Sequence, residues 1–229
     1  MAKIKLQGIL ADIRGKLNGS VFSKNRGGAY MRTKVTPINP QTIAQGLVRA
    51  TLTNLSQAWR GLTEAQRSAW NSAVSNFTST DIFGDIKTPS GINLFNKLNL
   101  NLAAISEAPI NTPPLAVPVG YFDTLSIAAA AGAGTIAATF TSVGGSVDQT
   151  VVVEATACMS AGKNFVKSEF RQIGTFAGNA ASPQAIGAMY VGKFGAMTAG
   201  QKLFIRFKFV DKNTGVAGQY TSASAVVAA

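Results

Sequence analysis

Residues 202–210 read Lys202-Leu203-Phe204-Ile205-Arg206-Phe207-Lys208-Phe209-Val210. Successive side chains of a β-strand point to opposite faces of the sheet. A strand here would place one apolar set on one face and a mixed, largely basic set on the other: Leu203, Ile205, Phe207 and Phe209 against Lys202, Phe204, Arg206 and Lys208. The segment Asp211-Lys212-Asn213-Thr214-Gly215 predicts a turn that returns the chain.

The sequence before and after this strand has the same short, β-rich character. Runs of strand-forming residues separated by glycine-containing turns occur near 121–129, 134–142, 148–157, 170–176, 201–210 and 216–227. Short strands at this spacing are typical of a β-sandwich. The run from Lys202 through Tyr220 to Val227 resembles the last two strands of fibronectin type III domains. We therefore predict an immunoglobulin- or fibronectin III-like β-sandwich over residues 119–229.

A proline-rich segment precedes the predicted sandwich. Residues 109–118 contain four prolines and show no apolar periodicity, which is typical of an extended, semi-rigid linker. A chain of 229 residues is long enough for two modest domains. We place the domains at 1–108 and 119–229, with 109–118 as a linker that joins neither core.

Helical periodicity dominates the second part of domain 1–108. Pro37 and Pro40 precede a predicted amphipathic helix, whose apolar residues are Ala44, Val48, Leu52, Leu55, Trp59 and Leu62. Thr63-Glu64-Ala65-Gln66 matches a capping box that begins a second helix, and Ser90 can cap a third. The first two helices are expected to pack as a helical hairpin, with Trp59 and Trp70 as the largest buried groups.

Short strands are predicted at the N-terminus. Between residues 12 and 35, Asn18-Gly19 is a strong hairpin signal, and residues 25–28 supply a second flexible turn. These turns predict a small β-meander whose last strand shows Tyr30, Arg32 and Lys34 on one face. The fold class of the whole chain is then α+β: a basic N-terminal β-hairpin plus helical docking domain, followed by a β-sandwich.

Positive charge is concentrated in this N-terminal region. The net charge of the chain is +11, and residues 1–60 hold ten lysines and arginines against the single acid Asp12. A positive field attracts nucleic acid, an anionic membrane surface and an acidic protein alike. Because an isolated basic hairpin is marginal in water, we expect it to contact a neighbouring subunit rather than nucleic acid. The predicted partner-binding residues are Lys24, Arg26, Tyr30, Arg32 and Lys34.

Catalytic chemistry has few candidate residues. The chain contains no histidine and one cysteine, Cys158, which predicts no enzyme activity, no catalytic residue, no cofactor, no metal site and no intrachain disulfide. Asp81 and Asp85 flank residues 82–84 in a predicted loop, which we interpret as a solvated turn, with a divalent cation as the alternative. Residues 24–28 could present backbone donors to a phosphate, or form a glycine-rich turn with solvated charges. No stretch is apolar enough to span a bilayer, which predicts synthesis in the cytoplasm and no membrane partner.

Two resemblances bear on function. The run from Leu55 to Trp70 is similar to the junction between the last two helices of an HMG box, which would imply DNA bending. However, residues 39–44 lack the basic, wedge-bearing first helix of that family, so we interpret the likeness as convergence.

More specifically, the runs 15–32 and 37–42 together with the Trp59 and Trp70 helix pair resemble a group of tailed-bacteriophage and prophage proteins, many of which end in an immunoglobulin- or fibronectin-like domain. The resemblance implies a virion structural protein: a minor capsid, decoration or head-tail component, made in the host cytoplasm and located in the virion. Its partners would be other virion proteins, with this chain as a homo-oligomer or in many copies in a symmetric assembly. The alternatives are a nucleic-acid-binding structural protein and a host-surface glycan-binding adhesin.

Overall fold

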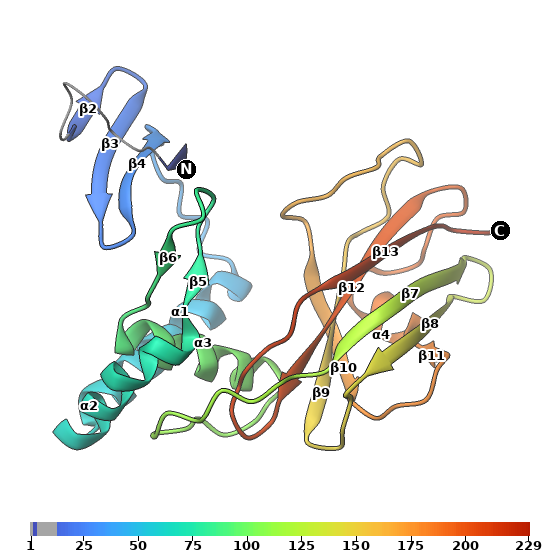
Figure 1. Cartoon of the computed structure of the whole chain (residues 1–229). Coiled ribbons are helices and arrows are strands. Elements are labelled where there is room, and N and C mark those ends of the chain that lie inside the picture. Colours follow the sequence, from blue (N-terminus) through green and yellow to red (C-terminus); the bar gives the residue numbers. More distant parts are fainter. Residues whose placement is uncertain (1, 4–12) are drawn as a thin grey trace.

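The computed structural model describes residues 2–3 and 13–229. Figure 1 shows three parts along the chain: a small N-terminal sheet, a helical region, and a larger β-rich region that contains the C-terminus. The helices among the described residues are all too short or too polar to cross a membrane. The predicted α+β class is confirmed, because helices and antiparallel strands both contribute major elements.

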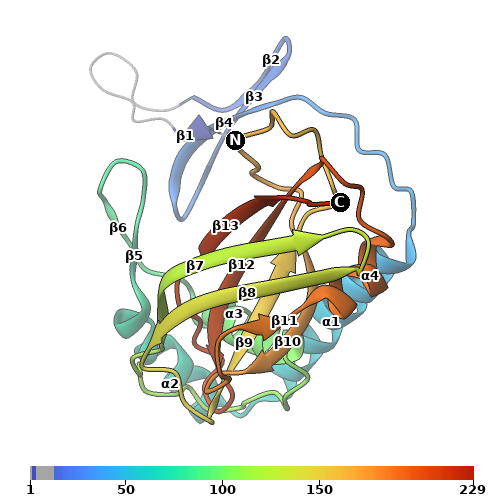
Figure 2. The ribbon, with the colours of Figure 1, turned by 90° about the vertical axis from the view of Figure 1, so that its right-hand side faces the viewer.

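The β-rich region consists of two antiparallel sheets. Its elements are β7 (Tyr121–Ala130), β8 (Thr135–Val143), β9 (Gln149–Ala155), β10 (Arg171–Ala177), β11 (Gln184–Ala185), α4 (Gly187–Phe194), β12 (Lys202–Asp211) and β13 (Thr221–Val226). One sheet has the order β10-β9-β12-β13 and the other has the order β11-β8-β7. Figure 2 shows the two sheets as successive layers. The six strand runs expected from the sequence are all present, whereas the short β11 and α4 were not predicted.

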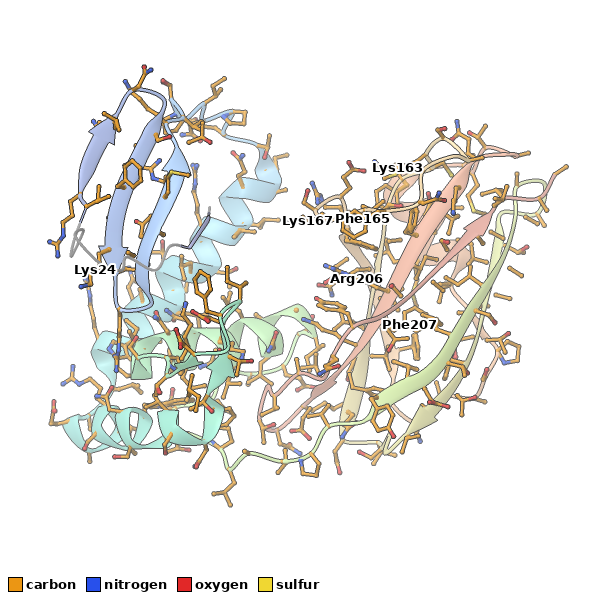
Figure 3. The ribbon with its side chains drawn as sticks, turned by 45° about the horizontal axis from the view of Figure 1, so that its top comes forward. Lys24, Lys163, Phe165, Lys167, Arg206 and Phe207 are labelled. Carbon is orange, nitrogen blue, oxygen red and sulfur yellow. The ribbon has the colours of Figure 1, made fainter. Side chains whose placement is uncertain are left out.

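The alternation that predicted β12 also places the core of this region. Side chains from both sheets form one apolar cluster, which includes Leu203, Ile205, Phe207, Phe209, Phe122, Ile136 and Val151. Figure 3 shows Phe207 and Arg206 on opposite sides of the sheet. Helix α4 adds Tyr190, whose hydroxyl donates to the carbonyl oxygen of Thr156 at 3.0 Å. Cys158 is partly buried and packs against this cluster.

The helical region is built around its last helix. It contains α1 (Ile43–Gly61), α2 (Glu64–Ala73), the 3₁₀ turn η1 (Val74–Phe77) and α3 (Gly91–Ala104). The predicted capping box is confirmed, since Thr63 and Gln66 bond reciprocally at the start of α2. The predicted pairing of the first two helices is wrong, because α1 and α2 both pack mainly on α3.

Phe95 of α3 explains this arrangement. Its ring lies 5.4 Å from the ring of Trp59 and 5.4 Å from that of Trp70, so the two tryptophans meet through the third helix. Trp70 is completely buried and Trp59 is half-buried. Both pack as apolar groups, as their helical spacing predicted.

The N-terminal sheet has the order β1-β4-β3-β2. Its strands are β1 (Ala2–Lys3), β2 (Gly15–Leu17), β3 (Ser20–Asn25) and β4 (Gly28–Thr33). The expected meander is therefore present over β2 to β4, with Asn18 at φ 48° in the first turn. A second small hairpin, β5 (Ser79–Thr80) and β6 (Ile86–Lys87), occupies the region predicted to be a loop.

The beginning of the proline-rich segment belongs to the helical core, contrary to the expectation that 109–118 would join neither core. The backbone N–H of Ile110 donates to Oδ1 of Asn99 at 2.7 Å, and Ile110 packs against the helical cluster. The indole N–H of Trp70 donates to the carbonyl oxygen of Asn111 at 2.9 Å. The path of residues 109–111 is thus fixed by buried side chains of α2 and α3.

Helix α3 also joins the helical region to the β-rich region. The side-chain amide of Asn101 donates to the carbonyl oxygen of Gly215 at 2.9 Å, and that of Gln172 donates to the carbonyl oxygen of Ala104 at 2.7 Å. Val216, in the segment between β12 and β13, packs against the helical cluster. The two regions therefore share an interface at the end of α3.

Limited proteolysis is expected to cut first within residues 112–118. Residues 115–118 are exposed and lie beyond the hydrogen bonds that hold 110 and 111. The measurement is N-terminal sequencing and mass spectrometry of the first fragments. Primary cleavage inside β12, with 112–118 protected, would contradict this prediction.

Candidate assembly interface

The register of the N-terminal sheet determines which side chains share a face. Residues directly opposite each other in neighbouring strands lie on the same face. Val21 is opposite Arg32, and Ser23 is opposite Tyr30. One face therefore carries Lys16, Val21, Ser23, Tyr30 and Arg32, and the other carries Leu17, Phe22, Lys24, Ala29 and Met31.

The five predicted partner-binding residues lie in or next to the same sheet, but they do not share one face. Tyr30 and Arg32 lie together, as their alternation predicted, while Lys24 lies on the opposite face. Arg26 is in the turn between β3 and β4, and Lys34 follows β4, with its backbone N–H donating to the carbonyl oxygen of Gly19. Positive charge thus surrounds this sheet rather than forming a single stripe.

Strands β2, β3 and β4 bury almost none of their side chains. Among residues 13–54 no side chain is buried, and Leu55 is the first buried residue after that stretch. Phe22, Tyr30 and Met31 are each only half-buried. Among residues 13–54, apolar groups are therefore present on both faces of the sheet without a buried core beneath them.

An open cavity of about 660 Å³ lies where the N-terminal sheet meets the helical region. It is lined by the β3–β4 turn, the β5–β6 hairpin and the start of α3. Its charged lining residues are Arg26, Lys87, Lys97, Asp81 and Asp85. The cavity thus brings together residues 24–28 and residues 81–85, for which the sequence left a phosphate and a divalent cation as alternatives.

In both segments, hydrogen bonds link groups within the local turn. In the glycine turn, the backbone N–H of Gly27 donates to Oδ1 of Asn25 at 2.9 Å, so this donor serves the turn itself. A Cβ at Gly27 would lie 2.6 Å from Nζ of Lys87, which shows how closely the two segments approach. The turn interpretation of residues 24–28 is the one that these contacts favour.

Asp81 likewise acts within its own turn. Its Oδ1 accepts from the backbone N–H of Phe83 at 2.7 Å and from that of Asp85 at 3.2 Å. Residues 2–3 and 13–229 contain no group of three acidic, histidine or cysteine side chains arranged to hold a metal ion. These contacts favour the interpretation of residues 81–85 as a hairpin turn.

A second charged cluster lies on the outer face of the β10-β9-β12-β13 sheet. The guanidinium of Arg206 lies 4.1 Å from the ring centre of Phe170 and 4.0 Å from that of Tyr220. Its Nε donates to Oε2 of Glu154 at 2.7 Å, and the Tyr220 hydroxyl donates to Oε1 of the same carboxylate at 2.8 Å. Burial lowers the pKa of the neighbouring Lys208. The sequence placed Arg206 and Lys208 on this face but did not indicate their aromatic neighbours.

The Tyr220 hydroxyl gives a pH test of this cluster. Burial, followed by the hydrogen bond to Glu154, raises the pKa of Tyr220 to about 12. A raised pKa favours the neutral phenol in the folded chain, so this contribution to stability is full below about pH 10 and is lost between about pH 10 and 12. We expect the melting temperature of the native chain to fall more steeply over that window than that of Tyr220→Phe. Equal slopes would contradict the assignment.

No family model, curated protein or solved structure matches this chain. The resemblance to tailed-bacteriophage proteins therefore stays a prediction made from the sequence.

Proposed function

We propose that this chain is a non-enzymatic structural protein that assembles through its N-terminal sheet, as a component of a tailed-bacteriophage virion such as a minor capsid, decoration or head-tail protein. The observation that carries the proposal is the absence of any buried side chain among residues 13–54, although β2, β3 and β4 lie within that range. The assignment to a virion rests on the resemblance of the sequence to tailed-bacteriophage proteins.

The physical argument concerns the stability of a sheet without a core. Ordering one residue costs about 1–2 kcal/mol of conformational entropy. A backbone hydrogen bond contributes about 0.5–1.5 kcal/mol in net terms, so a sheet of short strands needs buried apolar surface to be stable. A neighbouring subunit can supply that surface against Phe22 and Met31 on one face, or Val21 and Tyr30 on the other.

For the C-terminal region we infer the fibronectin III-like arrangement. Naming β7 to β13 as strands A, B, C, C′, E, F and G gives sheets with the orders E-B-A and C′-C-F-G. This is the strand order of fibronectin type III domains, and it supports the resemblance of residues 202–227 to their last two strands. Modules of this kind commonly act as rigid projections or spacers in assemblies.

The test is a double variant of the basic sheet. Arg26→Ala with Arg32→Ala removes two cations from the turn and from β4, and Lys167→Ala with Lys193→Ala removes the same charge from exposed positions of the C-terminal region. We expect the first variant to lose incorporation into particles and the second to keep it.

DNA retention measured over a salt series decides between assembly and nucleic-acid binding. The native chain and the Arg26→Ala, Arg32→Ala variant are compared by the slope of log affinity for DNA against log salt concentration. Tight DNA binding by the native chain would overturn the proposal if this slope is about one unit smaller in the variant for each removed phosphate contact. Equal incorporation of both variants would also count against docking through the sheet.

A further inference from the structure

Helix α1 carries one continuous apolar stripe, of which only the second half is covered. Leu47, Val48, Leu52, Leu55, Ala58 and Trp59 recur at helical spacing along it. Exposure falls along the helix from 86% at Ile43 to 66% at Leu47, 46% at Leu52 and 7% at Leu55. Helix α3 covers the stripe from Leu55 onward, whereas the first half extends beyond it.

The uncovered half is a well-formed helix. Oγ1 of Thr42 accepts from the backbone N–H of Gln45 at the N-terminus of α1. The Arg49 guanidinium donates to Oδ1 of Asn39 at 2.8 Å, which ties the preceding segment to the helix. Val35 and Ile38, just before the helix, are also largely exposed. Exposed apolar surface on a preformed helix is typical of a site that binds another protein.

The charge of the segment that carries Val35, Ile38 and the first half of α1 indicates the kind of partner: residues 34–54 contain Lys34 and Arg49 and no acid. The other cations between Asp12 and Glu64 lie in or beside the N-terminal sheet or, as Arg60 does, at the end of α1, and this whole stretch also lacks an acid. A second copy of a chain with net charge +11 would repel this region. Nucleic acid would neutralise the charge but would leave Ile43, Leu47 and Val48 exposed to water.

We propose that the first half of α1, with Val35 and Ile38, docks into an apolar groove with an acidic rim on another protein. The apolar side chains provide the affinity, and the surrounding cations steer the encounter. The proposal deepens the assembly function and rests on it, since it names a second contact surface and the chemistry of the partner.

The experiment uses the full chain in the cells that produce it, with the photocrosslinking residue benzoylphenylalanine at position 47. The matched control places it at position 57, which is exposed on the other side of the same helix. We expect at least tenfold more crosslinked product at 47 than at 57, to a single protein whose crosslinked peptide is acidic. Arg49→Glu, on the uncovered half of α1, should lower the yield at least fivefold, and changing an acid of that peptide to lysine should restore it.

Each other outcome has a defined meaning. Crosslinks to this same chain or to nucleic acid, equal yields at both positions, or an absent charge-swap rescue would overturn the acidic-groove proposal. If the native chain enters particles without a crosslink at 47, the proposal for α1 fails and the assembly function stands. If the native chain does not enter particles, the assembly function itself fails. Leu47→Asp is compared with Gln57→Asp by urea unfolding, so that a folding defect is recognised.

Discussion

Gly215→Ala is expected to lower the free energy of unfolding by about 3 kcal/mol, through backbone strain and overpacking together. Gly215 has φ +68°, a conformation that side chains disfavour, and a Cβ there would overlap the carbonyl oxygen of Leu98. The same Cβ would lie 3.0 Å from Cγ of Leu102. Because Asn101 also holds the Gly215 carbonyl, the substitution should push α3 away from the β12–β13 turn. Urea unfolding measures the loss.

Gly200→Ala is the matched control. Gly200 has φ +76°, and a Cβ there would have no neighbour within 4 Å, so this variant carries the backbone strain without the collision. We expect it to cost about 1 kcal/mol. Equal losses for the two variants would show that α3 does not press on Gly215, and would contradict the interface between the helical and β-rich regions.

Trp70→Ala is expected to lower the free energy of unfolding by roughly 4 kcal/mol, as is typical when a fully buried aromatic side chain is removed. Trp70 is completely buried, and its ring lies nearly perpendicular to that of Phe95. The variant also leaves the Asn111 carbonyl without its indole donor, so residues 109–111 should loosen. Urea unfolding and the rate of proteolysis around 109–118 measure the two effects.

Trp70→Phe separates these effects, because it keeps an aromatic ring but removes the indole N–H. We expect a smaller loss of stability, with about 1 kcal/mol of it from the hydrogen bond, and faster cleavage after residue 111. Unchanged cleavage in both variants would mean that Trp70 does not hold the start of the linker.

The pattern of the sequence predicted the local structure well. Alternation at 202–210 indicated β12 and the side chains that enter its core, and the capping box at residues 63–66 indicated where α2 begins. These predictions succeeded because strand alternation and helix capping depend on residues a few positions apart. Strand β11 and helix α4 were missed because two and eight residues are too short to show a clear period.

The candidate interface was predictable in composition but not in geometry. The excess of cations in the N-terminal region is a property of the sequence, and the predicted partner-binding residues were chosen from it. The pairing of β3 with β4 placed Lys24 on the face opposite Tyr30 and Arg32, because register determines which residues share a face. The aromatic neighbours of Arg206 come from segments before β10 and β13, so no local spacing could indicate them.

Periodicity in the sequence thus determined which face of each element is apolar, whereas the tertiary structure decided what covers that face. The stripe on α1 is continuous in the sequence, yet only the part from Leu55 onward meets α3. The hydrogen bonds from Trp70 to Asn111 and from Asn101 to Gly215 join residues 41 and 114 positions apart. An apolar face of a helix or strand is stabilised by burial against any apolar surface, because the hydrophobic effect is non-directional. The choice of α3 as the common partner, and the exposure of the first half of α1, therefore follow only from the way the elements pack together.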